Sequence, residues 1–154
     1  MTQLTANFSL AEMTVTTHRN IPNVCPKELL PDLMDTAAML ERIRDMLSRA
    51  KGGTVYIHVN SGYRSDALNK AIGGSSKSDH SKAKAADIVA PSYGSPKDIA
   101  KMIVPRMKEL GVGQVIYEFG SWVHVSSNVP DKTINSVLTA RFTPTGTEYS
   151  PGIT

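Results

Sequence analysis

The sequence predicts an α+β fold in which a small antiparallel sheet is flanked by helices. The first observation is an apolar stripe between residues 27 and 50, whose three- and four-residue spacing is typical of an amphipathic helix. The second is a pair of alternating apolar and polar runs on either side of Gly120-Ser121, which predicts a β-hairpin. Helices that stand apart from hairpin-connected strands favour this class over a parallel α/β sheet.

Capping signals locate the first two helices. Ser9 followed by Glu12 is a capping box and predicts a short helix. Pro26 precedes the longest helix, about 27–50, and Pro31 lies close enough to its start to end or kink the first turn.

Two further helices follow the long one. Ser65 can cap a short helix that runs through Ala71. Ser95 opens a helix to about residue 110, and Pro105 should bend or split it.

Strand signals are alternating runs bounded by glycine or polar residues. We expect strands at 54–60, 85–89, 114–119 and 122–127.

We expect a single domain over residues 1–154, because a chain of 154 residues is large enough for one core and small for two. Residues 1–127 would form the core of this domain. Residues 128–154 are rich in Pro, Thr, Ser and Gly, and they predict an irregular C-terminal segment around one possible strand at 136–142.

Charge and composition exclude some partners. The net charge is only +3, its basic residues are scattered, and aromatic residues make up 6% of the chain, so nucleic-acid binding is not expected. The mild positive charge is compatible with an anionic polymer as a partner.

Cysteine use and hydropathy bear on the compartment. Cys25 is the only cysteine, so no internal disulfide is possible. No apolar run reaches the roughly 18 residues of a membrane span, and the first residues lack a signal-peptide pattern. We therefore expect a soluble chain without its own export signal. The sequence does not indicate its oligomeric state.

Three residues could form a metal site. His80 and Asp87 stand seven apart, which suits neither one helical face nor one strand face, so His80 would lie on a loop and Asp87 on the following strand. His124 lies in an alternating run. Two imidazoles and one carboxylate are the ligand set of a catalytic zinc with a fourth position open for water.

Other interpretations of these residues remain open. The two histidines could be hydrogen-bonded at a sheet edge, and Asp87 could pair with Lys82 or Lys84. His18 and His58 are expected to be surface or packing residues.

Several short motifs occur in order. They are SGYRS from Ser61, LN from Leu68, IGGS from Ile72, SxHxxxxAxD from Ser78 and WVHVS from Trp122. Together they resemble the zinc D-alanyl-D-alanine carboxypeptidase family, which includes vancomycin-resistance carboxypeptidases and phage L-alanyl-D-glutamate endopeptidases. The opening NFSLAEMT is similar to the small phage-type branch. The resemblance covers most of the chain to about Ser127 and implies the fold shared with the Hedgehog signalling domain.

The resemblance implies roles for individual residues. It implies that His80, Asp87 and His124 bind zinc, and that Arg64 binds substrate or polarises the scissile carbonyl. A guanidinium suits either task because its planar fork stays charged. The alternative for Arg64 is a structural salt bridge.

The chain departs from the family pattern at two positions. The usual glycine three residues after the first histidine is Ala83, which matters only if that position needs a positive φ. The usual Glu or Asp three residues before the last histidine is Ser121, and serine cannot serve as the general base at neutral pH.

Glu118 is the leading candidate for the general base, and Asp79 is a weaker one. An even hairpin loop would turn Glu118 and His124 to opposite faces, whereas an odd loop, for instance 120–122, would set Glu118 directly across from His124. Catalysis by Glu118 therefore predicts an odd loop or a bulge.

The resemblance implies a zinc-dependent peptidase that hydrolyses peptidoglycan stem peptides, as either a carboxypeptidase or an endopeptidase. A phage lysis enzyme, held in the host cytoplasm before release, or a virion-associated component fits a chain without a signal peptide. The alternative is a non-catalytic, zinc-containing cell-wall-binding or virion structural module of the same fold, with Ser121 as the sign of lost catalysis.

Overall fold

A computed structural model describes residues 2–154 of the chain. Its strands form one mostly antiparallel sheet in the order β1-β2-β4-β3-β5-β6, in which β3 and β5 are the parallel neighbours. The α+β class is thereby confirmed. The strand bounds are β1 His58–Ser61, β2 Ala85–Val89, β3 Gln114–Glu118, β4 Trp122–Ser126, β5 Val137–Thr143 and β6 Gly146–Pro151.

The helices lie close to their predicted positions, although the helix expected from residue 27 opens with a 3₁₀ turn and becomes α-helical only at Leu30. The Ser9 side chain accepts from the Glu12 backbone N–H, and the Glu12 carboxylate accepts from the Ser9 N–H, so the capping box is formed. Pro31 lies in the first turn of the long helix, and Pro105 lies in a 3₁₀ turn between two helices. The helix bounds are α1 Leu10–Met13, α2 Leu30–Lys51, α3 Asp66–Ala71, α4 Pro96–Ile103 and α5 Met107–Leu110, with 3₁₀ turns at Lys27–Leu29, Val104–Arg106 and Thr133–Asn135.

None of the helices described between residues 2 and 154 is both long and apolar enough to cross a membrane.

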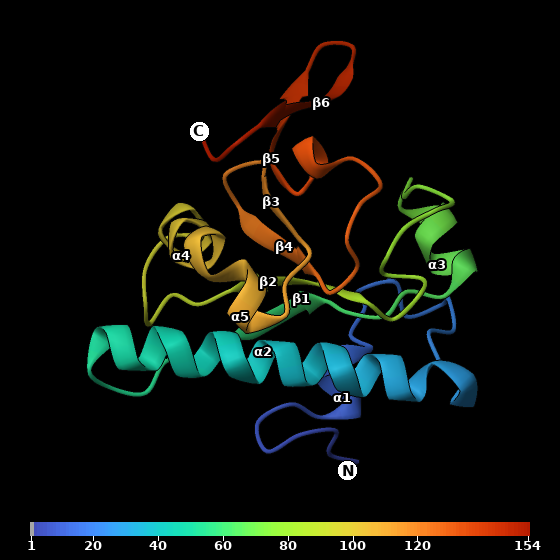
Figure 1. Cartoon of the computed structure of the whole chain (residues 1–154). Coiled ribbons are helices and arrows are strands. Elements are labelled where there is room, and N and C mark those ends of the chain that lie inside the picture. The colour runs from blue at the N-terminus through green and yellow to red at the C-terminus, as the bar shows by residue number, and fades with distance from the viewer. Residues whose placement is uncertain (1) are drawn as a thin grey trace.

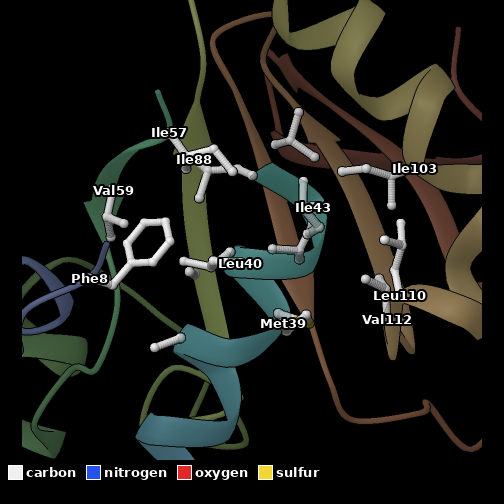
Figure 2. Packing of buried hydrophobic residues seen from close by; sticks show 14 of the residues in the cluster. Phe8, Met39, Leu40, Ile43, Ile57, Val59, Ile88, Ile103, Leu110 and Val112 are labelled. Atoms are coloured by element: carbon white, nitrogen blue, oxygen red, sulfur yellow. The ribbon is translucent and has the colours of Figure 1, made fainter. Parts of the chain in front are cut away.

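The hydrophobic core lies between the sheet and the helices. Figure 1 shows α2 running along one side of the molecule, with the β5–β6 hairpin projecting at the opposite end. Leu40 and Ile43 of α2 lie close to Ile88 of β2, and Phe8 from the N-terminal segment lies beside Val59 of β1 (Figure 2). Because side chains alternate along a strand, the residues next to Ile88 point to the other face of the sheet.

The first strand is shorter than the sequence predicts. Burial alternates from residue 55 to 60 as expected, but sheet pairing begins only at His58. Upstream of it, the N–H groups of Val55 and Tyr56 donate to the hydroxyls of Ser48 and Ser92. These side-chain bonds replace a β-ladder.

The C-terminal segment contains more regular structure than the sequence indicated. The strand expected at 136–142 is β5, and a second strand, β6, follows it and pairs with it antiparallel. Nearly every residue of β6 is exposed, so the strand lacks the apolar alternation that would have predicted it.

Ala83 has a φ of +60°, in the left-handed region, although its methyl group is buried. Its carbonyl accepts a hydrogen bond from the Thr36 hydroxyl of α2 at 2.7 Å. This position therefore needs the conformation that glycine adopts freely, and alanine is held there at a cost of about 1–2 kcal/mol.

We expect Ala83→Gly to leave the free energy of unfolding within about 0.5 kcal/mol of the wild type, because relief of the left-handed strain offsets the lost methyl and the gained chain entropy. Ala100→Gly, at a buried position within α4, should instead cost about 1.5–2 kcal/mol. Urea unfolding of the two variants measures both values. Equal destabilisation at both positions would contradict the argument.

Candidate metal centre

The pairing of β2 with β4 brings two of the three predicted ligands together. Asp87 is the register partner of His124, so both side chains stand on the same face of the sheet, opposite the face on which Ile88 packs against α2. His80 approaches from the loop before β2, and its carbonyl accepts from the Arg64 N–H at 3.1 Å. A loop histidine and a strand aspartate are the arrangement that the seven-residue spacing predicted.

Three donor atoms of these residues form a nearly equilateral triangle. His80 Nε2 lies 3.2 Å from both Asp87 Oδ1 and His124 Nδ1, and His124 Nδ1 lies 3.1 Å from Asp87 Oδ1. Donors about 2.0–2.1 Å from a tetrahedral zinc would be about 3.3–3.4 Å apart. The triangle is therefore close to the size that such an ion requires.

The hydrogen bonding of His80 favours a cation in this triangle. Its Nδ1 lies 2.8 Å from the Gly62 carbonyl, which can only accept, so Nδ1 carries the proton of the neutral ring and Nε2 presents a lone pair. A proton on His124 Nδ1 could form a good hydrogen bond to only one of the two acceptors that face it, His80 Nε2 or Asp87 Oδ1. All three residues are buried, and a divalent cation would satisfy the two ring nitrogens and the carboxylate oxygen together.

The charges in the site are consistent with this fit. Burial alone would raise the pKa of Asp87, but His80 and His124 outweigh it and hold the pKa of this carboxyl far below its ordinary value. Burial would lower the pKa of His124, but its hydrogen bond to Asp87 and the charges of Asp87 and Glu118 raise it. A fixed carboxylate thus produces a negative potential between the imidazoles.

Arg64 holds the second oxygen of Asp87. Its Nη2 donates to Asp87 Oδ2 at 3.1 Å, and its Nε donates to Ser61 Oγ at 3.0 Å. Asp87 Oδ1 thereby remains directed at the two histidines. The structural ion pair weighed for Arg64 is present, and the Arg64 side chain is 13% exposed.

Asn69 is a residue of the site that the sequence analysis did not single out. It is buried, its Oδ1 accepts from Arg64 Nη1 at 3.2 Å, and its Nδ2 donates to the Ser75 carbonyl at 2.7 Å. It therefore joins Arg64 to the loop that leads to His80. The LN motif was the available signal.

The β3–β4 hairpin has an odd loop. Glu118 pairs with Trp122, so residues 119–121 form a three-residue loop. This loop begins one residue earlier than the loop 120–122 considered from the sequence. Glu118 consequently lies on the same face as His124. It is the diagonal neighbour of His124, because the residue directly across from His124 is Ile116. Its Oε1 lies 3.6 Å from His124 Nδ1. Burial and the charge of Asp87 raise the pKa of Glu118.

The other candidates for the base form hydrogen bonds outside the His-Asp-His cluster. Ser121 is exposed in the turn, where its hydroxyl donates to the Phe119 carbonyl. Asp79 accepts from Ser126 Oγ at 2.9 Å and from Asn128 Nδ2 at 3.0 Å. Its carboxylate therefore links the loop before β2 to the end of β4. His18 and His58 are exposed and outside the cluster.

We expect one zinc ion per chain after reconstitution, and less than a tenth of that in Asp87→Ala, because that change removes the anionic donor and leaves Arg64 uncompensated. His58→Ala is the matched control, since it removes an exposed histidine of the same sheet. Elemental analysis after gel filtration gives the stoichiometry. Zinc at 100 times its Kd should also stabilise the wild type by about 2.7 kcal/mol. Full zinc content in Asp87→Ala would contradict the assignment.

Comparison with known proteins agrees with the motifs and the fold. A family model described as Peptidase M15 matches residues 6–126, which is most of the chain and contains all three candidate ligands, Arg64 and Glu118. A search of curated proteins found no match. The six-stranded, mostly antiparallel sheet with its flanking helices is consistent with the Hedgehog/DD-peptidase fold of that family. The chain belongs to the Peptidase M15 family, a family of metallopeptidases, and carries a buried His-Asp-His site suited to their metal.

Proposed function

We propose that this protein is a zinc-dependent peptidase that hydrolyses an amide bond in the stem peptides of peptidoglycan. The observation that carries the proposal is the triangle of His80, Asp87 and His124, with Glu118 beside it on the same face. Among residues 2–154 this cluster has three donors, so a four-coordinate ion keeps one position that the chain does not fill. When bound, zinc would act as a Lewis acid on the scissile carbonyl and on the attacking water.

Glu118 would be the general base. Its carboxylate takes a proton from the attacking water and passes it to the leaving amine. Burial and the charge of Asp87 raise the pKa of Glu118, and a zinc ion bound by Asp87 would act in the opposite direction. Its position 3.6 Å from His124 Nδ1 supports this role.

Arg64 would stabilise the negative charge that develops on the carbonyl oxygen. Three of the five N–H donors of its guanidinium are engaged by Ser61, Asn69 and Asp87, which leaves two for a substrate. A preorganised cation of this kind is worth roughly 10²–10³ in rate.

Two features support a cell-wall substrate. The net charge of +3 suits an anionic polymer, and the motifs resemble those of peptidoglycan carboxypeptidases and endopeptidases. The opening segment 7–14 further favours a phage-type lysis enzyme or virion component. The non-catalytic module remains the rival function, and it would keep the metal without hydrolysis.

We expect Glu118→Gln to lower kcat on purified peptidoglycan by about 10²–10⁴ while zinc stoichiometry stays near one, because the amide keeps the size of the side chain but cannot accept the proton. Release of new free amines measures the rate. Ser121→Ala is the matched control from the same hairpin and should leave the rate unchanged.

Two outcomes would contradict this assignment. A Glu118→Gln enzyme with wild-type turnover would remove Glu118 from the chemistry. A fully metallated wild type that releases no amines from peptidoglycan or from synthetic stem peptides would favour the non-catalytic module.

We expect Arg64→Lys to lower kcat by about 10²–10³ at saturating zinc, since lysine keeps the charge but lacks the second donor that reaches the substrate. A role confined to orienting Asp87 would instead weaken zinc binding, and excess zinc would restore the rate. Activity assayed across a zinc titration separates the two. Full recovery at high zinc would overturn the substrate role.

A further inference from the structure

The C-terminal hairpin extends the sheet beyond Glu118, outside the part of the chain that matches the family. The match ends at residue 126, whereas β5 and β6 span 137–151 and project from the body of the molecule (Figure 1). β5 lies directly beside β3, the strand that carries Glu118.

A row of register partners leads from Glu118 to the hairpin. Glu118 is opposite Ala140 of β5, and Ala140 is opposite Tyr149 of β6, so the three side chains share one face of the sheet. Ala140 is small. Burial raises the pKa of Tyr149, and the charge of nearby Glu118 raises it further. Tyr149 therefore faces the same site as the candidate base.

Aromatic rings line this part of the face. Phe142 is two residues beyond Ala140, so it has the same orientation, and its ring stacks on Phe119 with centroids 3.9 Å apart. Phe142 is 76% exposed and Tyr149 is 54% exposed. We call Phe119, Phe142 and Tyr149 the aromatic platform. Exposed aromatic residues that adjoin a polar site are typical of ligand-binding surfaces.

The platform has no cation of its own. The positions of the described hairpin that share its face are Leu138, Ala140, Phe142, Thr147, Tyr149 and Pro151. Arg141 and Glu148 pair on the opposite face, and Arg141 donates to the side chains of Ser150 and Thr154. A free carboxylate directly after the cut bond would find no counter-charge on this hairpin, whereas a continuing peptide would find apolar and ring contacts.

The position of the platform relative to Glu118 decides which part of the substrate it meets. The candidate ligands lie on β2, on β4 and on the loop before β2, and the platform lies on the other side of Glu118. The group that passes a proton to the leaving amine must lie beside that amine. The segment after the scissile bond would therefore extend over Ala140 toward Tyr149.

We propose that the aromatic platform binds the substrate segment that follows the scissile bond, and that the enzyme is an endopeptidase that needs at least two residues on that side. This inference rests on the proposed peptidase function and deepens it. It makes Tyr149 a specificity residue and assigns a binding role to residues that the family match does not cover.

Binding of leaving-group peptides tests the proposal without requiring turnover. The chain has a single tryptophan, Trp122, which pairs with Glu118 and packs edge-on against Phe119, so its fluorescence reports on this face. The zinc-loaded protein is titrated with D-alanine, the leaving group of a carboxypeptidase, and with the tripeptide γ-D-glutamyl-L-lysyl-D-alanine. We expect the tripeptide to bind at least tenfold more tightly.

Variants of Tyr149 assign the difference to the platform. Tyr149→Ala should weaken tripeptide binding by about tenfold and leave D-alanine binding unchanged, while Tyr149→Phe keeps the ring and most of the affinity. Glu148→Ala, one residue away on the opposite face, is the matched control and should change neither. In hydrolysis assays, Tyr149→Ala should raise KM for extended substrates with little change in kcat.

Two results would overturn the proposal: D-alanine binding the wild type as tightly as the tripeptide, or tripeptide affinity that is the same in wild type and Tyr149→Ala. The comparison of D-alanine with the tripeptide on the wild type tests the proposal even if a variant does not fold. Failure of the peptidase function would show differently, as a lack of hydrolysis with every substrate while the binding difference persists.

Discussion

The register between β2 and β4 is the constraint on which the site depends. It sets Asp87 beside His124 on the face opposite α2 and buries a carboxylate whose charge would cost several kcal/mol if it were unpaired. Arg64 compensates one oxygen of Asp87, and the other oxygen is left to the histidines. A slip of one residue would turn Asp87 into the apolar core, so the core and the metal site select the same pairing.

The turn after β3 connects the candidate base to the C-terminal hairpin. Phe119 has a φ of +57°, which costs a non-glycine residue about 1–2 kcal/mol. Its N–H donates to the Ala140 carbonyl at 2.9 Å, and its ring stacks on Phe142, so β5 holds the turn in this conformation. The turn keeps Glu118 on the face of His124. Ala140 and Phe142, which lie after the part of the chain that matches the family, thus help to position Glu118, which lies within it.

Much of this could be predicted from the sequence because the signals are local. The capping box at Ser9 specifies α1, and the apolar periodicity specifies α2. The spacing of His80 and Asp87 predicted a loop and a strand, which is what the structure contains. The position of the loop at 119–121, the strand β6 and the link from Asn69 to Arg64 were not predictable, because each depends on tertiary contacts that leave no local pattern.

The central claim is that His80, Asp87 and His124 share one divalent ion. X-ray absorption at the zinc edge of the reconstituted protein tests it most directly, since the spectrum reports the atoms around the ion. The account predicts four nitrogen or oxygen neighbours at about 2.0–2.1 Å, with the outer-shell scattering of two imidazoles. A sulfur neighbour from Cys25, a single imidazole, or zinc bound only weakly with an all-water shell would contradict it.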